Sequence, residues 1–198
     1  MISKASISRL RHQMLHSLVE SETPTVYAMA GIPASGKSTF VATAQARGEF
    51  PVSAFVLNPD LVMTALPEYQ KIAREEGLVA AFDMYEMPAR ELAYELFAEA
   101  VEQQVDIIKD MASARQENYE ILQGLKRKGY RLYMFYIAVE PDEAIRRSGA
   151  RPGRHTPVEL IRERSHSLKL LLPQYRGLVD EFHAFDNNDQ KRPYRRII

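Results

Sequence analysis

A glycine-rich run around a lysine lies near the start of this 198-residue chain. Residues 31–38 read GIPASGKS, which fits the phosphate-binding pattern G-x-x-x-x-G-K-[ST]. The glycines let the backbone turn its N–H groups around a phosphate, Lys37 reaches the β- and γ-phosphates, and the Ser38 hydroxyl is suited to Mg²⁺. We therefore predict that ATP is bound by the residues Gly31, Ala34, Ser35, Gly36, Lys37, Ser38 and Thr39.

The surroundings of this loop match what a phosphate site requires. The apolar run at 25–30 (TVYAMA) has the length of a strand, and helical spacing begins at Lys37 and continues to about residue 46. The positive end of that helix would point at the bound anion. The alternative is a glycine turn with an exposed lysine, which leaves both the strand before it and the helix after it unexplained.

Two aspartates follow apolar runs that we expect to form strands. Asp60 comes after the run 52–57, which Asn58-Pro59 closes, and Asp110 follows the run 105–108. A carboxylate at the ligand edge of a sheet can accept the proton of an attacking hydroxyl or hold a metal ion. We predict Asp60 as general base and Asp110, with Ser38, as Mg²⁺ ligands. Two alternatives stay open: Asp60 as a helix cap and Asp110 as a strand-end turn residue.

Arginine is concentrated in residues 146–164, which read RRSGARPGRHTPVELIRER. Six of these nineteen residues are arginine, in a chain with no net charge. Guanidinium groups are planar, permanently charged and bidentate toward phosphate, as phosphoryl transfer requires. Glycines and prolines interrupt the segment, which indicates a lid made of two helices and a loop. The alternative is a solvated basic helix pair, with Arg146 and Arg162 in ion pairs with Glu159 and Glu163.

The composition limits which cellular compartment and which classes of partner we expect. There are 26 basic and 26 acidic residues, so no overall field attracts nucleic acid or a membrane surface, and we expect neither as a partner. The chain has no cysteine, which excludes disulfides and fits a reducing compartment. No signal-peptide core and no run of ~20 apolar residues is present. These features predict a cytoplasmic protein.

Strand-like and helical segments alternate along the chain. Apolar runs of strand length lie at 25–30, 52–57, 105–108, 131–139 and 182–185. Helical spacing is found at 3–20, 37–46, 69–82, 88–104, 115–128, 141–148 and 157–171. The pattern predicts an α/β P-loop NTPase with a mostly parallel sheet of about five strands, helices on both faces and an arginine-rich helical lid. We expect one domain, 1–198, divided into an N-terminal helix at 1–22, a nucleotide-binding core at 25–188 with its lid at about 141–171, and a solvated basic tail at 189–198.

Four longer segments read GIPASGKST, VLNPDLVMTALPEY, KRKGYRLYMFYIAVEPDEAIRR with its continuation GARPGRHTPVELIRER, and LLPQYRGLVDEFHAFDNND. In these segments the chain resembles the zeta-toxin-like P-loop kinases, the toxic component of epsilon/zeta toxin–antitoxin systems and their solitary relatives. The resemblance spans roughly residues 25–188. Its most specific parts are Asn-Pro-Asp at 58–60, the Leu-Pro-Glu-Tyr that follows, and the order of arginine, glycine, histidine and proline in the lid.

The resemblance implies an ATP-dependent kinase and roles at the matching positions. Asp60 would deprotonate the acceptor hydroxyl, Lys37 would hold the phosphates, and Ser38 would bind Mg²⁺. Zeta toxins phosphorylate UDP-N-acetylglucosamine at the sugar 3′-hydroxyl, so a sugar nucleotide is the implied acceptor. An antibiotic, a nucleoside or a polynucleotide 5′ end remains an alternative acceptor, and a non-catalytic nucleotide-binding switch remains an alternative function.

The lid and the segment after the third strand carry further implied roles and two departures. Arg151 and Arg164 match the lid arginines that contact the transferring phosphate, and Arg147 matches another recurrent lid arginine. The lid has Gly-Arg-His at 153–155 where relatives often have Gly-Gly-His. Only Asp110 remains where relatives usually carry an acid–threonine pair.

Two further segments of the sequence each leave two interpretations open. Arg90 and Glu91, on the helix expected at 88–104, face either the substrate or solvent. The N-terminal helix at 3–20 either engages an antitoxin protein or caps the sheet.

Overall fold

A computed structural model of the chain describes residues 2–150 and 156–197. Within these residues one sheet has the strand order β2-β3-β1-β4-β5-β6. The first five strands are parallel and β6 is antiparallel to β5, which confirms the mostly parallel sheet. The strands are β1 (Thr25–Ala30), β2 (Phe55–Leu57), β3 (Ile107–Lys109), β4 (Arg131–Ala138), β5 (Glu181–Asp186) and β6 (Arg195–Arg196).

Strand β6 is the main difference from the predicted sheet, which had about five strands. It lies in the segment 189–198, which we expected to be a solvated basic tail, and pairs with the carboxyl end of β5. A run of arginines carries no apolar strand signal, and two residues are too few to show a period, so pattern alone does not reveal it.

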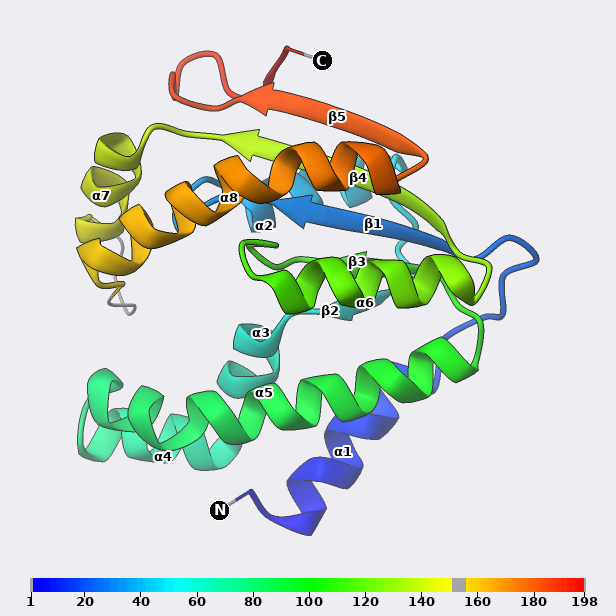
Figure 1. The fold of residues 1–198 in the computed structure, drawn as a ribbon. Coiled ribbons are helices and arrows are strands. Elements are labelled where there is room, and N and C mark those ends of the chain that lie inside the picture. The colour runs from blue at the N-terminus through cyan, green and yellow to red at the C-terminus, as the bar shows by residue number, and fades with distance from the viewer. Residues whose placement is uncertain (1, 151–155, 198) are drawn as a thin grey trace.

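Helices cover both faces of the sheet, as predicted. In Figure 1, α6 and α8 lie over one face and α2 over the other, while α5 runs beside the β2 edge with α1, α3 and α4 around it. The helices are α1 (Lys4–Leu15), α2 (Lys37–Ala46), α3 (Pro59–Ala65), α4 (Pro67–Glu75), α5 (Leu78–Glu102), α6 (Gln116–Arg127), α7 (Pro141–Gly149) and α8 (Val158–Leu178).

The central strands are apolar because both of their faces are covered. Val26 in β1 lies beside Ile107 of β3 and Leu132 of β4, and all three belong to the larger buried cluster under α6 and α8. Met29, whose side chain points the opposite way, joins the smaller cluster with Val41 of α2. Each such fully buried side chain contributes about 1.5–3 kcal/mol.

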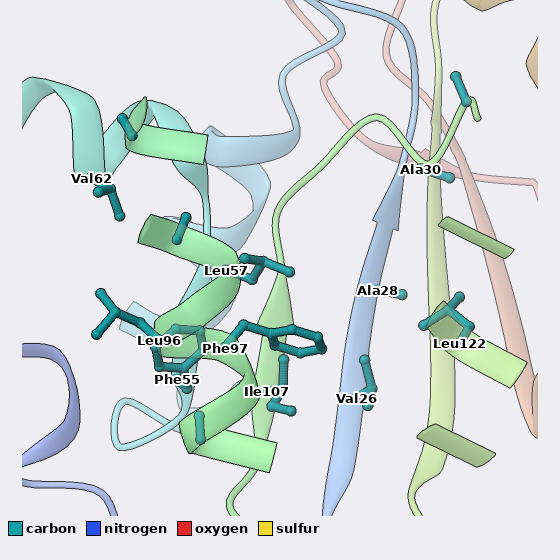
Figure 2. Packing of buried hydrophobic residues seen from close by; sticks show 14 of the residues in the cluster. Val26, Ala28, Ala30, Phe55, Leu57, Val62, Leu96, Phe97, Ile107 and Leu122 are labelled. Atoms are coloured by element: carbon teal, nitrogen blue, oxygen red, sulfur yellow. The ribbon is translucent and has the colours of Figure 1, made fainter. Parts of the chain in front are cut away.

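Helix α5 begins ten residues earlier than the predicted start at 88 and runs through Pro88. Proline removes one hydrogen bond of the helix, but Tyr85 and Ala89 on either side of it are buried, so packing sustains the helix through that point. Figure 2 shows Phe97 of α5 close to Phe55 of β2, with ring centroids 6.5 Å apart. Helix α8 likewise passes Pro173 and ends beyond the predicted residue 171.

The N-terminal helix α1 packs against α5 and the edge strand β2. Ser3 caps it, and the Ser6 hydroxyl donates to the Glu68 carboxylate of α4 at 2.8 Å, as does the Ser3 backbone N–H at 3.1 Å. Burial raises the pKa of Glu68, but hydrogen bonds from Ser3 and Ser6 outweigh it and lower the pKa to about 2. The glutamate of the Leu-Pro-Glu-Tyr segment therefore anchors α1.

Every predicted site segment in the described part of the chain follows the carboxyl end of a parallel strand or lies in the lid. The phosphate loop follows β1, Asp60 follows β2, Asp110 follows β3, and α7 follows β4. Ligands bind at this edge in open α/β sheets, because strand ends and helix N-termini converge there.

Candidate active site

Three residues of the phosphate loop have positive φ, the region that favours glycine. Gly31 and Gly36 have φ of 149° and 96°, and Ala34 has φ of 62°. A Cβ at Gly31 would lie 2.7 Å from the Ile137 carbonyl oxygen, and one at Gly36 would lie 2.7 Å from Asn187 Nδ2. Both glycines are therefore required by close neighbours as well as by conformation.

Lys37 begins α2 with its side chain lying along the loop. Its Nζ donates to the carbonyl oxygens of Gly31 at 2.9 Å and Ile32 at 3.0 Å. The Gly31 N–H in turn donates to the Ala112 carbonyl oxygen at 3.1 Å, which links the phosphate loop to the segment after β3. The ammonium group is thus held at the N-terminus of α2, where a phosphate would meet both charge and dipole.

Residues of the C-terminal segment donate hydrogen bonds to the backbone of the phosphate loop. Asn187 Nδ2 donates to the Ser35 carbonyl oxygen at 2.8 Å, and the Tyr194 hydroxyl donates to the Gly36 carbonyl oxygen at 3.0 Å. Arg147 donates to the Asn187 carbonyl oxygen at 2.6 Å, so the lid helix α7 joins the same contact set. The sequence analysis assigned no role to Asn187 or Tyr194, although Asn187 lies in the segment LLPQYRGLVDEFHAFDNND that carries part of the family resemblance.

Asn58 is a site residue that sequence reasoning missed. Its side-chain oxygen caps α3 by accepting from the N–H groups of Asp60 at 3.0 Å and Leu61 at 3.4 Å. Its Nδ2 donates to Asp110 Oδ2 at 2.8 Å. The alternative in which Asp60 caps the helix is therefore wrong: Asn58 is the cap, and it joins the candidate base to the candidate metal ligand.

Asp110 has the character of a hard-cation ligand. Its side chain is buried, and its Oδ1 has no hydrogen-bond partner in the described part of the protein. The Ser38 hydroxyl lines the same cavity. Mg²⁺ takes one or two carboxylates with water and substrate phosphates, so this donor set fits it. Among the described residues there is no group of three histidine, cysteine or acidic side chains for a metal cage.

Three arginines from three elements gather in the same cavity: Arg90 of α5, Arg115 before α6 and Arg164 of α8. Burial, followed by the positive charge of Arg115, lowers the pKa of Arg164, and the charge of Arg90 acts in the same direction. Arg90 pairs with Glu86, and Arg164 lies 3.2 Å from Glu163. Arg164 is the buried member of the three, and positive charges that repel one another in one cavity are stabilised by a bound anion.

The predicted lid arginines divide into three groups. Arg164 and Arg147 line the cavity. Arg146 and Arg162 form exposed ion pairs, as the alternative reading held, but with Glu143 at 2.7 Å and Asp142 at 3.3 Å instead of Glu159 and Glu163. Arg151 and the segment 153–155 lie outside the described residues.

Lys109 is a further residue that sequence reasoning did not single out. It is fully buried at the end of β3, where its Nζ donates to Asn118 Oδ1 at 2.6 Å and to Ser113 Oγ at 3.3 Å. Burial lowers its pKa to about 7, against the opposing charge of Asp110. Ser113 donates to the Met29 carbonyl oxygen at 2.6 Å, so Lys109 braces the 110–115 segment against β1.

One cavity of about 600 Å³ lies at this edge of the sheet. The residues that the sequence predicted and that line it are Ala34, Gly36, Lys37, Ser38, Thr39, Asp60, Asp110, Arg147 and Arg164. Gly31 and Ser35 shape the loop without lining the cavity. Arg90 lines both this cavity and a shallow surface depression beside Tyr94, whereas Glu91 borders only the depression.

A model of the family described as Zeta toxin matches residues 11–197. The chain belongs to the zeta toxin family. This zeta toxin family member is a phosphotransferase, and a nucleotide is the substrate that the family implies for it. A comparison with curated protein sequences gave no significant match.

Solved structures show the same fold at low sequence identity. The chain matches a structure from the PezAT chromosomal toxin–antitoxin system of Streptococcus pneumoniae with TM-score 0.74 and 14% identity, over 100% of this chain and 82% of that one. It matches the AvrRxo1-ORF1:-ORF2 complex with TM-score 0.66 and 15% identity, over 96% of this chain and 64% of that one. It also matches a putative kinase from Chloroflexus aurantiacus with TM-score 0.55 and 17% identity, over 86% of this chain and 88% of that one.

The helices do not meet the requirements for crossing a bilayer in the part of the chain that the structure describes. In the described ranges 2–150 and 156–197, none is both long and apolar enough to cross a membrane. Helix α5, the longest in these ranges, carries six acidic residues and one arginine.

Proposed function

We propose that the chain transfers the γ-phosphoryl group of ATP to a hydroxyl of a UDP-N-acetylglucosamine-like sugar nucleotide. One observation carries this proposal: Arg90, Arg115 and Arg164 share a cavity with the phosphate loop and with Asp60. The loop accounts for the donor phosphates, so a second cluster of cations in the same cavity calls for another anion, and the diphosphate of a sugar nucleotide supplies it.

The transfer requires a base between the donor and the acceptor. Asp60 accepts the proton of the acceptor hydroxyl, whose oxygen forms a bond to the γ-phosphorus while the bond from that phosphorus to the β–γ bridging oxygen breaks and ADP leaves. Lys37 and Arg164 stabilise the negative charge that spreads over the transferring oxygens. Asn58 holds the N-terminus of α3, and therefore the position of Asp60.

Mg²⁺ fits the donor set of Ser38 and the buried, unpartnered oxygen of Asp110. When bound there, the ion would neutralise charge on the β- and γ-phosphates. Asn58 keeps the other Asp110 oxygen engaged at 2.8 Å, which orients the carboxylate.

The test is incubation with γ-³²P-labelled ATP, Mg²⁺ and, in separate reactions, UDP-N-acetylglucosamine, UDP, N-acetylglucosamine, a nucleoside and a 5′-hydroxyl oligonucleotide. Label on UDP-N-acetylglucosamine, and none on N-acetylglucosamine, is the expected result. Label on the nucleoside or oligonucleotide alone would replace the proposed acceptor. ATP binding without any labelled product would indicate a nucleotide-dependent switch.

We also propose a protein antitoxin as partner. Family membership supports it, as does the structural match to a component of a toxin–antitoxin system. Expression of the chain in bacteria should arrest growth, and expression of Asp60→Asn should not. Co-expression of the gene adjacent to that of the chain should restore growth and yield a complex on co-purification; growth arrest that persists with no complex formed would reject that gene product as the antitoxin.

A further inference from the structure

A second cavity, of about 630 Å³, adjoins the first at the candidate base. It lies between α2, α3, α4 and the start of α5, and it shares Ser38, Asp60 and Asp110 with the first cavity. A ligand whose hydroxyl lies at Asp60 can therefore extend into both. The volume is in the range of pockets that bind small molecules.

The two cavities differ in charge. One lysine and four arginines line the first cavity, namely Lys37, Arg90, Arg115, Arg147 and Arg164. Among the described residues that line the second there is no lysine, arginine or histidine, whereas Asp60, Asp83 and Asp110 all border it. Phosphate is therefore attracted to the first cavity and repelled from the second.

The second cavity is lined mainly by apolar side chains from separate elements. Val41 of α2 and Tyr69 of α4 are buried in its wall, while Leu61 of α3 and Val79 of α5 are 54% and 66% exposed at its opening. Phe82 borders both cavities and brings an aromatic ring next to the base. Covering these side chains with an uncharged apolar group removes their surface from water, which is favourable.

We propose that the second cavity binds an uncharged, apolar or aromatic part of the acceptor while the anionic part lies among the arginines. The inference rests on the proposed function and narrows its acceptor class. The acceptor is a hydroxyl compound with phosphate on one side of the reacting hydroxyl and an uncharged apolar group on the other. A small sugar phosphate would leave the second cavity unfilled.

The test uses two dyes with a shared ring system. N-phenyl-1-naphthylamine is uncharged, and 8-anilino-1-naphthalenesulfonate carries a sulfonate. The uncharged dye should bind saturably, and Val79→Asn should weaken it about fivefold or more, because an amide replaces an apolar contact. Val79→Lys should weaken the uncharged dye too but strengthen the sulfonate dye relative to Val79→Asn. Met87→Asn, on an exposed apolar residue of the same helix that lines neither cavity, should change neither dye.

Dye binding needs no phosphoryl transfer, so it separates this inference from the proposed function. Saturable binding in a protein that labels no sugar nucleotide would support the pocket while rejecting that acceptor. Unchanged dye affinity in Val79→Asn, or an equal loss in Met87→Asn, would overturn the inference even with full kinase activity. Conversion of a dimer to a monomer by Val79→Asn in sedimentation would also overturn it, because a second copy would then cover the cavity.

Discussion

At the scale of single residues, Asn58 connects the two acids of the candidate site. One side-chain amide caps the helix that carries Asp60 and donates to Asp110. The amide can serve both because its oxygen accepts and its nitrogen donates. A carboxylate at position 58 could accept from the helix but would repel Asp110, so the asparagine is specified by both neighbours.

Substitution of the two acids should separate their roles. Asp60→Asn should lower kcat by about 10²–10⁴-fold with the ATP Kd unchanged, because the general base is lost while the phosphate loop is intact. Asp110→Asn retains an acceptor for Asn58 and should instead raise the Mg²⁺ concentration needed for half-maximal rate. Kinase assays with a Mg²⁺ titration and ATP binding by calorimetry measure both effects. Full activity in Asp60→Asn would reject the proposed mechanism.

Because Lys109 is buried, the free energy of unfolding should depend on pH above about pH 7. Its pKa of about 7 in the folded protein lies below its ordinary value of 10.5. Between these values the unfolded chain holds a proton that the folded chain lacks, so the free energy of unfolding rises as pH increases from about 7 toward 10. Lys109→Met should lack this rise. Urea unfolding of both proteins at pH 7, 8 and 9 measures it, and parallel curves would show that the proton is retained on folding.

At the scale of elements, α1 is held by a polar contact at one end and apolar packing along its length. Leu10 and Leu15 are buried in the main cluster, while Ser3 and Ser6 bind Glu68. The contact ties the N-terminus to α4, whose Tyr69 lines the second cavity. The contact therefore connects α1, through α4, to one wall of that cavity.

The Glu68 contact should weaken in acid. The pKa of Glu68 is about 2 in the folded protein and 4.5 ordinarily, so its contribution to stability is complete above 4.5 and is lost as pH falls toward 2. Glu68→Gln should cost about 1 kcal/mol at pH 6, because hydrogen bonds to a charged acceptor are lost at a half-exposed site. The difference between the two proteins should shrink at pH 3. A difference that is independent of pH would contradict the assignment.

The segment ending in β6 should tune nucleotide affinity through the phosphate loop. Tyr194→Phe removes the hydrogen bond to the Gly36 carbonyl oxygen but keeps the ring that packs on Phe40. We expect the ATP KM to rise about fivefold, which corresponds to ~1 kcal/mol, with the acceptor KM unchanged. Tyr133→Phe, on β4 and in neither cavity, is the control. An equal effect of both substitutions would indicate general loosening of the sheet.

At the scale of the whole molecule, three layers converge on one edge of the sheet. Helices α5, α6 and α8 bring Arg90, Arg115 and Arg164 there from positions spread over 75 residues of the chain. None of the three is adjacent to another in sequence. A ligand that contacts all of them therefore ties together the helices on the sheet face and at the sheet edge.

Nucleotide binding should stabilise the fold as a unit. At an ATP concentration of about 100 times Kd with Mg²⁺, linkage adds about 2.7 kcal/mol, which for a domain of this size raises Tm by roughly 5–10 °C. Lys37→Ala should abolish most of the shift, because it removes the ammonium group that meets the phosphates. Thermal unfolding with and without ATP measures this. A shift of equal size in Lys37→Ala would place the nucleotide elsewhere.

The sequence alone determined the phosphate loop, the order of strands and helices, and the positions of Asp60 and Asp110 after their strands. These features depend on local signals: glycine at positive φ, apolar runs of strand length, and polar residues at strand ends. The same signals failed where packing overrides them. Pro88 and Pro173 lie inside helices that buried neighbours sustain, and β6 is a strand only because β5 offers it an edge.

Only the tertiary structure decided which distant side chains meet. It made Asn58 the cap in place of Asp60, buried Lys109 next to the candidate metal ligand Asp110, and set Arg90 and Arg115 in one cavity with Arg164. It also placed a mainly apolar cavity beside the candidate base. The physical reason is that backbone geometry and apolar periodicity are encoded within about ten residues, whereas a binding site is made by surfaces from separate elements that come together only when the core packs.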